Sequence, residues 1–131
     1  MRNTEWMTNM EIEMDPQKTV KFAIEGIQEK KGKQIVVLDL NKIENIACKY
    51  FVICHGTSKP HVEAIAESIE DFIREKAQDK PINKEGRENA EWILIDYFDI
   101  VIHVFQEPVR KFYKLEELWA DAEIQNIADL D

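Results

Sequence analysis

Residues 92–105, WILIDYFDIVIHVF, contain two short apolar segments separated by Phe98 and Asp99. Such segments, rich in β-branched and aromatic residues, are typical of β-strands, and their close spacing predicts a hairpin. With a loop of two or four residues, one face of the hairpin carries a mixed set of side chains: Trp92, Leu94, Asp96, Val101, His103 and Phe105. The other face is apolar and is expected to be core: Ile93, Ile95, Tyr97, Ile100, Ile102 and Val104. A three-residue loop would change this pairing, and Phe98-Asp99 is unfavourable for a tight two-residue turn.

The rest of the chain predicts helices and further strands around the hairpin. Asp15 followed by Pro16 is a typical helix start, and a second helix begins at Thr57 or Ser58. The other predicted elements are strands at 35–40 and 50–54, a short edge strand within 82–89, and a last helix over 108–119 with Phe112, Leu115 and Trp119 on one face. This order predicts a single domain of the α/β (α+β) class, with a mixed β-sheet of about five strands and flanking helices.

The chain divides into three parts on this view. We expect a flexible N-terminal extension at residues 1–14, one domain at 15–120 and an acidic C-terminal tail at 121–131. No stretch approaches the ~20 apolar residues of a membrane span, and the polar, acidic start is not a secretory signal. Cys48 and Cys54 have no C-x-x-C spacing, which favours reduced thiols and a cytoplasmic protein without membrane partners.

Charge limits the classes of partner. The chain has 17 Lys and Arg against 26 Asp and Glu, a formal net charge of -9. Phosphate backbones repel such a protein unless a basic patch overrides the field, and the sequence has no obvious patch of this kind. We therefore expect no sequence-specific nucleic-acid binding. The acidic residues that follow Lys114 are either a solubilising tail or part of a surface for a basic partner.

The segment YFVICHGTSKPHVEAI, residues 50–65, has a glycine turn that leads into a helix. Free N–H groups at a helix N-terminus can bind an anion, so a nucleotidyltransferase-like enzyme acting at Gly56, Thr57 and Ser58 is one alternative. Such enzymes also need paired acids on a following strand to hold magnesium, and INKEGREN has no D-x-D or D-x-E. The interpretation that we favour is a structural turn and helix cap that matters for folding.

Other catalytic or metal-binding arrangements are weak. Cys54 and His55 are neighbours on a predicted strand, so their side chains point to opposite faces and cannot serve one reaction centre. Of Asp96, Asp99 and His103, Asp99 lies in the turn, which leaves Asp96 and His103 as two ligands of mixed type and at best diagonal neighbours. We therefore predict no enzyme activity, no metal and no cofactor.

The mixed face of the hairpin is the strongest candidate site. It is either covered by the last helix, which would make Trp92 part of the core, or open as a protein-binding surface. In the second case the surface centres on Trp92, because tryptophan supplies a large anchoring area at interfaces. The predicted partner-binding residues are Trp92, Leu94, Asp96, His103 and Phe105, with Glu85, Glu91 and Asp99 near the rim.

Several motifs in a fixed order resemble one known family. They are a strand ending in Gly-Thr-Ser with a helix that opens with His, the pattern E-G-x-x-x-x-x-W-I-L, the pattern D-x-x-D followed by three β-branched residues and His, and E-L-W near the end. Together, over roughly residues 16–120, they resemble the ribosomal silencing factors, also called Iojap-like proteins.

This resemblance implies a fold similar to the nucleotidyltransferases without their catalytic acids. It also implies binding to the large ribosomal subunit through its ribosomal protein fourteen, with a steric block of subunit joining that represses translation. Family members are often homodimers when free. The Trp-Ile-Leu motif maps onto residues 92–94, within the mixed face.

The chain departs from the family pattern at three positions. Lys49 stands where an aspartate is usual, His55 where a serine is usual, and Phe98 where a glycine often makes the hairpin turn. The first two changes concern local contacts, and the third concerns the geometry of the turn.

Overall fold

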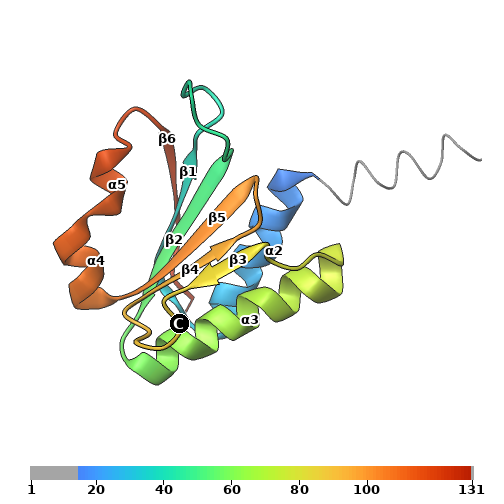
Figure 1. Cartoon of the computed structure of the whole chain (residues 1–131). Helices are drawn as coiled ribbons and strands as arrows, with labels where there is room; N and C mark the ends of the chain where they lie inside the picture. Colours follow the sequence, from blue (N-terminus) through green and yellow to red (C-terminus); the bar gives the residue numbers. More distant parts are fainter. Residues whose placement is uncertain (1–14, 131) are drawn as a thin grey trace, which may run out of the picture.

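The computed structural model describes residues 15–130. The predicted extension at residues 1–14 lies outside the described residues. Within them the chain forms one mixed α/β domain, as predicted, with six strands rather than about five (Figure 1). The elements are α2 (Pro16–Glu29), β1 (Lys33–Asp39), β2 (Tyr50–Gly56), α3 (Lys59–Ala77), β3 (Asn83–Glu85), β4 (Trp92–Asp96), β5 (Ile100–Gln106), α4 (Glu107–Tyr113), α5 (Leu115–Leu118) and β6 (Glu123–Ile127).

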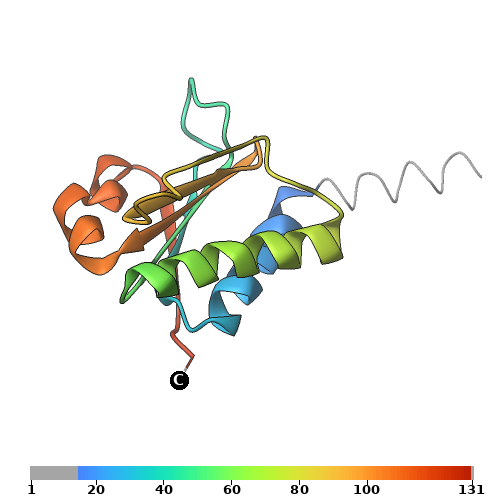
Figure 2. The ribbon, with the colours of Figure 1, turned by 60° about the horizontal axis from the view of Figure 1, so that its bottom comes forward.

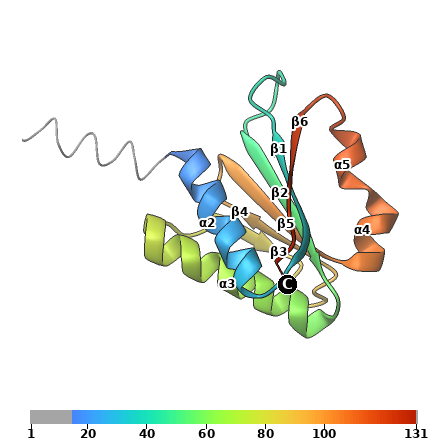
Figure 3. The same cartoon turned by 180° about the vertical axis from the view of Figure 1, so that it is seen from behind.

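The sheet separates two helical layers. Its strand order is β3-β4-β5-β2-β1-β6, and only the central β2–β5 pair among these neighbours is parallel. Helices α2 and α3 cover one face, which we call the core face, while α4 and α5 lie over part of the opposite face (Figures 2 and 3). The chain leaves β2 toward one face and β5 toward the other, so the carboxyl ends of these two strands lie at a topological switch point.

Close contact between α2 and α3 depends on Gly26. A Cβ at this position would lie 2.8 Å from the Cα of Ile69, closer than real atoms approach. The Ser68 hydroxyl donates a hydrogen bond to the Gly26 carbonyl at 2.7 Å, which ties the two backbones together. Because the helices approach so closely, their apolar side chains pack with those of the sheet into one hydrophobic core, the larger of the two in the domain.

The predicted hairpin register is confirmed. Trp92 lies opposite Phe105, Leu94 opposite His103 and Asp96 opposite Val101. The alternate residues, such as Ile93 and Ile95, are buried on the core face.

A sixth strand lies where the sequence suggested a tail. Residues Glu123–Ile127 pair antiparallel with β1, and Asp129 accepts a hydrogen bond from the Gln34 N–H at 2.7 Å. The boundary after residue 120 is therefore corrected, because β6 belongs to the same sheet. Sequence patterning missed it because EIQNI is short and mostly polar, as an edge strand exposed to solvent can be.

The turn between β2 and α3 is closed by its own side chains. Ser58 Oγ accepts a hydrogen bond from the His61 N–H at 3.2 Å and caps α3. His61 Nδ1 accepts from the Thr57 N–H at 3.0 Å, and His61 Nε2 donates to the Lys30 carbonyl at 2.7 Å. These contacts occupy donors that an anion would need, which favours the structural interpretation of this turn.

Gly56 is required here for space. It is absent from the residues with positive φ, but a Cβ would lie 3.1 Å from both His61 Nδ1 and the Val62 nitrogen.

Phe98 adopts a strained backbone conformation at the hairpin tip. Its φ is 76°, and the Asp99 N–H donates to the Tyr97 carbonyl at 3.0 Å, which matches a γ-turn with a positive φ at its central residue. The Asp96 carboxylate supports the turn by accepting from the Phe98 N–H at 2.7 Å. The ring itself is 61% exposed, so little packing offsets the strain.

We expect Phe98→Gly to stabilise the protein. Glycine relieves a left-handed backbone strain of about 1–2 kcal/mol in the folded state. Part of this gain, about 0.5–1 kcal/mol, is lost because glycine gives the unfolded chain more conformational entropy. The free energy of unfolding, measured in urea, should therefore rise by roughly 0.5–1 kcal/mol. Phe98→Ala is the matched control, because it removes the ring but keeps the Cβ. Equal stability of the two variants would contradict the strain argument.

We expect Ser58→Ala to lower the free energy of unfolding by about 1 kcal/mol, because α3 loses its cap. Thr57→Ala should cost less, since within residues 15–130 the Thr57 hydroxyl has a hydrogen-bond contact with His61 alone, at 3.3 Å. Thermal and urea denaturation measure both. A Ser58→Ala variant as stable as the parent would show that the turn is not held by this cap.

Candidate functional site

The face of the sheet opposite the core face brings the predicted site residues together, but at different depths. Trp92, Leu94, Asp96 and Asp99 are half-buried, and the rim residues Glu85 and Glu91 are exposed. His103 and Phe105 are buried, with Phe105 fully inaccessible. The expectation that these last two side chains form part of an open surface is corrected: they lie beneath it and support it.

Trp92 is the centre of an aromatic cluster. Its ring centroid lies 4.8 Å from that of Phe105 and 5.1 Å from that of Tyr113 on α4. Its indole N–H donates to His103 Nδ1 at 3.0 Å, which fixes the orientation of the ring. The indole therefore has a buried edge that is hydrogen-bonded and packed, and a remaining part that is open to solvent.

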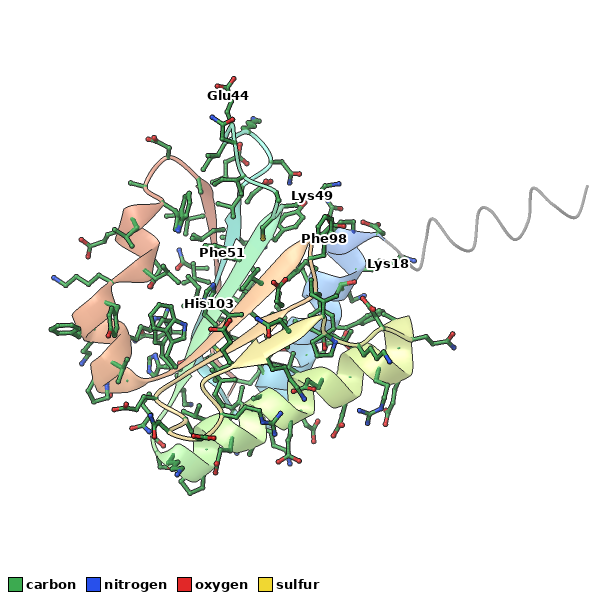
Figure 4. The ribbon with its side chains drawn as sticks, viewed as in Figure 1. Lys18, Glu44, Lys49, Phe51, Phe98 and His103 are labelled. Carbon is green, nitrogen blue, oxygen red and sulfur yellow. The ribbon has the colours of Figure 1, made fainter. Side chains whose placement is uncertain are left out.

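His103 is held in its neutral form. Because Nδ1 accepts from Trp92, the ring proton lies on Nε2. Burial lowers the pKa of His103 to about 4, and the Phe51 ring packs edge-on at 4.8 Å (Figure 4). A neutral, buried imidazole in this position aligns Trp92 and has no access to a substrate.

Helices α4 and α5 cover this face only in part. Val109, Leu115 and Trp119 belong to the smaller hydrophobic cluster on this face, which also includes Phe105. The two alternatives for Trp92 were a core residue under the last helix and an open surface residue. Trp92 lies between them, since its side chain is partly covered and partly exposed.

The single helix predicted over residues 108–119 is two short helices. Lys114 has a φ of 48° and breaks the helix between α4 and α5. Phe112 therefore does not share a buried face with Leu115 and Trp119, as the helical spacing suggested. Its ring is 79% exposed and packs edge-on against Tyr113 at 5.1 Å.

Sequence reasoning missed Phe112 and Tyr113 as surface residues. Together with Trp92 they form a continuous aromatic patch, which we call the Trp92 patch (Trp92, Phe112 and Tyr113). An adjacent pair of aromatic residues cannot bury both rings from one short helix, and this signal was available in the letters KFYK. Adjacent exposed aromatic rings of this kind mark interaction sites on soluble proteins.

Arg110 fastens α4 to the sheet. The residue is only 6% exposed, and its guanidinium donates to Glu116 at 2.9 Å and to the Gln34 carbonyl at 2.7 Å. A third contact joins the guanidinium to His55 Nδ1 at 3.0 Å. These contacts link α4 to α5, β1 and β2 at once, so the position of Tyr113 depends on Arg110.

The structure does not bring together a Cys–His catalytic pair or a metal site in residues 15–130. Cys54 and His55 point to opposite faces, and burial raises the pKa of the Cys54 thiol to about 12, which keeps it protonated. Within residues 15–130 no group of three or more His, Cys, Asp or Glu side chains is placed to hold a metal ion. In the same residues no helix is long and apolar enough to cross a membrane.

Comparisons with known proteins agree with this architecture. The family described as ribosomal silencing factor during starvation matches residues 13–131. The ribosomal silencing factor RsfS of Bacillus subtilis is 40% identical over 119 residues, which cover 90% of this chain and 96% of that protein. The RsfS of Halalkalibacterium halodurans is 39% identical over 109 residues, covering 83% of this chain and 92% of the relative.

A solved structure shows the same fold. The crystal structure of a Chromobacterium violaceum protein superposes with a TM-score of 0.76 at 34% identity, covering 82% of this chain and 88% of the other. With the family match extending over β6 as well as the predicted domain, the chain belongs to the ribosomal silencing factor family.

Proposed function

We propose that this protein is a ribosomal silencing factor that binds the large ribosomal subunit and represses translation by blocking the joining of the small subunit. Its docking point is ribosomal protein fourteen, a basic protein. The observation that carries the proposal is the Trp92 patch, an exposed aromatic surface on a chain that belongs to this family. In this proposal the protein works in the cytoplasm, where the subunits meet.

The charge of the protein supports the choice of partner. A net charge of -9 repels the RNA that forms most of a ribosomal surface and attracts a basic protein exposed on it. Near the Trp92 patch, Glu91 precedes β4 and Glu85 lies on β3 opposite Leu94, and both are exposed. Attraction to the protein partner combined with repulsion from RNA selects one docking place on the particle.

The geometry of the patch fits an anchoring role. Packing on Phe105 and the hydrogen bond to His103 fix the orientation of the Trp92 ring, so the ring loses little freedom on binding. Tyr113 and Phe112 extend the surface by two further rings, 51% and 79% exposed. Tryptophan and tyrosine are enriched among the residues that dominate binding energy at interfaces, as this anchoring role requires.

Substitutions in the patch should weaken binding without unfolding the chain. We expect Trp92→Ala to reduce affinity for purified large subunits by about 30-fold and Tyr113→Ala by about tenfold, as losses of about 2 and 1.4 kcal/mol imply. Co-sedimentation and subunit-joining assays measure these effects.

Ile124→Ala is the matched control for the patch. Ile124 is an apolar side chain, 49% exposed, on the far edge strand β6. Its removal should leave binding unchanged. Folded Trp92→Ala and Tyr113→Ala variants that bind like the parent would refute the site, and Tyr113→Ala serves as the test if Trp92→Ala melts early.

Charge reversal at the rim tests the choice of a basic partner. We expect Glu91→Lys to weaken binding to large subunits, and the loss to shrink as salt screens the interaction. Glu67→Lys on α3 makes the same charge change at an exposed position of the opposite helical layer and should bind normally. Equal affinity of the two variants would count against a basic partner at this rim.

We also expect no nucleotide turnover. With the Thr57 N–H bound by His61 and no acid pair on the following strand β3, the turn lacks the means to hold a metal-bound triphosphate. Incubation with magnesium and nucleoside triphosphates should release no phosphate or pyrophosphate above a blank. Release that disappears in Ser58→Ala would restore the enzyme alternative.

A further inference from the structure

His55 lies at the end of β2, beneath α4, and is 4% exposed. Its Nδ1 is 3.0 Å from a guanidinium nitrogen of Arg110. An arginine side chain keeps its protons and can only donate, so Nδ1 must be the acceptor of this bond. The neutral imidazole therefore carries its proton on Nε2, and its bond to Arg110 exists only while the ring is neutral.

Protonation of this ring would remove the bond. An imidazolium has two donors and no acceptor, so its Nδ1–H would face the guanidinium and place two cations within about 3 Å of each other. Arg110 cannot relieve this by losing a proton, nor by turning away. Glu116 holds its Nε and Nη2, and the Gln34 carbonyl accepts from Nη1, the same nitrogen that contacts His55.

Other charged groups around His55 act in both directions. Glu107 of α4 has a carboxylate oxygen 3.7 Å from Nε2, too far for a hydrogen bond, and its side chain is 44% exposed. The remaining groups are Lys111 of α4, Lys114, Glu116 and Glu117 at the α4–α5 junction, and Asp129 after β6. Burial first, and Arg110 second, outweigh the two attracting carboxylates and lower the pKa of His55 from 6.5.

The same bond positions the candidate binding surface. Arg110 is in α4, and α4 ends with Tyr113, whose ring packs on Trp92 at 5.1 Å. A change at His55 is thus passed through Arg110 and α4 to the Trp92 patch. Neither His55 nor Arg110 belongs to the exposed patch, so both are positioning residues.

We propose that protonation of His55 loosens α4 from the sheet, separates Tyr113 and Phe112 from Trp92, and thereby weakens partner binding at mildly acid pH. The part that concerns the partner rests on the function proposed above. The part that concerns α4 is a property of the protein alone and can be tested without ribosomes.

The expected pH window follows from linkage. With α4 detached, His55 is exposed and titrates near its ordinary pKa of about 6.5. The ratio of attached to detached α4 therefore falls by up to tenfold per pH unit below that value, until the attached form is protonated as well. Burial lowers the pKa of the second buried imidazole, His103, to about 4, so His103 stays neutral in the attached form throughout this window. A variant at position 55 is therefore needed to assign the pH dependence to His55.

The first experiment follows the native protein by nuclear magnetic resonance between about pH 7.5 and pH 5. The carbon shifts of the His55 ring give its pKa, and backbone amide shifts report on α4 and, as an internal reference, α2. We expect the amides of residues 110–114 to change with the same midpoint as His55, while those of α2 stay constant. Amide shifts of α4 that stay constant while His55 titrates would overturn the proposal.

The second experiment uses His55→Asn, in which the amide oxygen takes the place of Nδ1 as acceptor and does not titrate. At about pH 7.5 the variant should bind large subunits like the parent, and at about pH 5.5 it should bind more tightly than the parent by several-fold. An equal loss of binding in both proteins at the lower pH would overturn the role of His55.

The two failures are distinguishable. If neither protein binds large subunits at neutral pH while α4 still titrates with His55, the proposed function fails and the coupling between His55 and α4 stands. If both bind at neutral pH and α4 does not follow His55, the coupling fails and the proposed function stands.

Discussion

A single buried guanidinium determines how much of the outer face of the sheet the last two helices cover. Helices α4 and α5 are short, seven and four residues, and neither would be stable alone. Their position comes from Arg110, which reaches Glu116, the Gln34 carbonyl and His55. Removal of one partner from such a buried network typically costs several kcal/mol, about 3–5, because the remaining charge is left uncompensated. The depth of Phe105 and the half-exposure of Trp92 both follow from this attachment.

The two faces of the sheet differ in how their side chains are packed. On the core face, α2 and α3 pack closely enough to require Gly26, and the buried side chains there are mostly aliphatic. On the opposite face an aromatic cluster lies beside aliphatic residues such as Val36 and Leu38, and it is ordered by polar contacts such as the one between Trp92 and His103. Stability therefore comes mainly from one face, which leaves the other free to carry a partly exposed surface. The parallel pair β2–β5 makes this possible by sending α3 and α4 to opposite sides.

The sequence predicted those parts of the fold that depend on alternation and caps. The hairpin register followed from the period of two in residues 92–105, and the starts of α2 and α3 followed from Asp15 and Ser58. The break at Lys114 did not, because a lysine with positive φ leaves no signal in a helical pattern. For the candidate site, Trp92 was found. Its exposed neighbours Phe112 and Tyr113 were missed because an unbroken helix over 108–119 would place Phe112 on the same face as Leu115 and Trp119. The burial of His103 and Phe105 depends on Arg110, whose distant partners no local pattern reveals.

The last strand has a consequence for shortened forms of the protein. β6 covers the outer edge of β1, a strand whose central residues are the apolar run from Ile35 to Leu38. An uncovered apolar edge offers unpaired N–H and carbonyl groups to another chain, which is the usual start of strand-to-strand aggregation. The polar side chains of β6, among them Glu123 and Gln125, make a poor template for further pairing. A chain that stops near residue 120 would leave this edge of β1 uncovered and open to pairing with another chain.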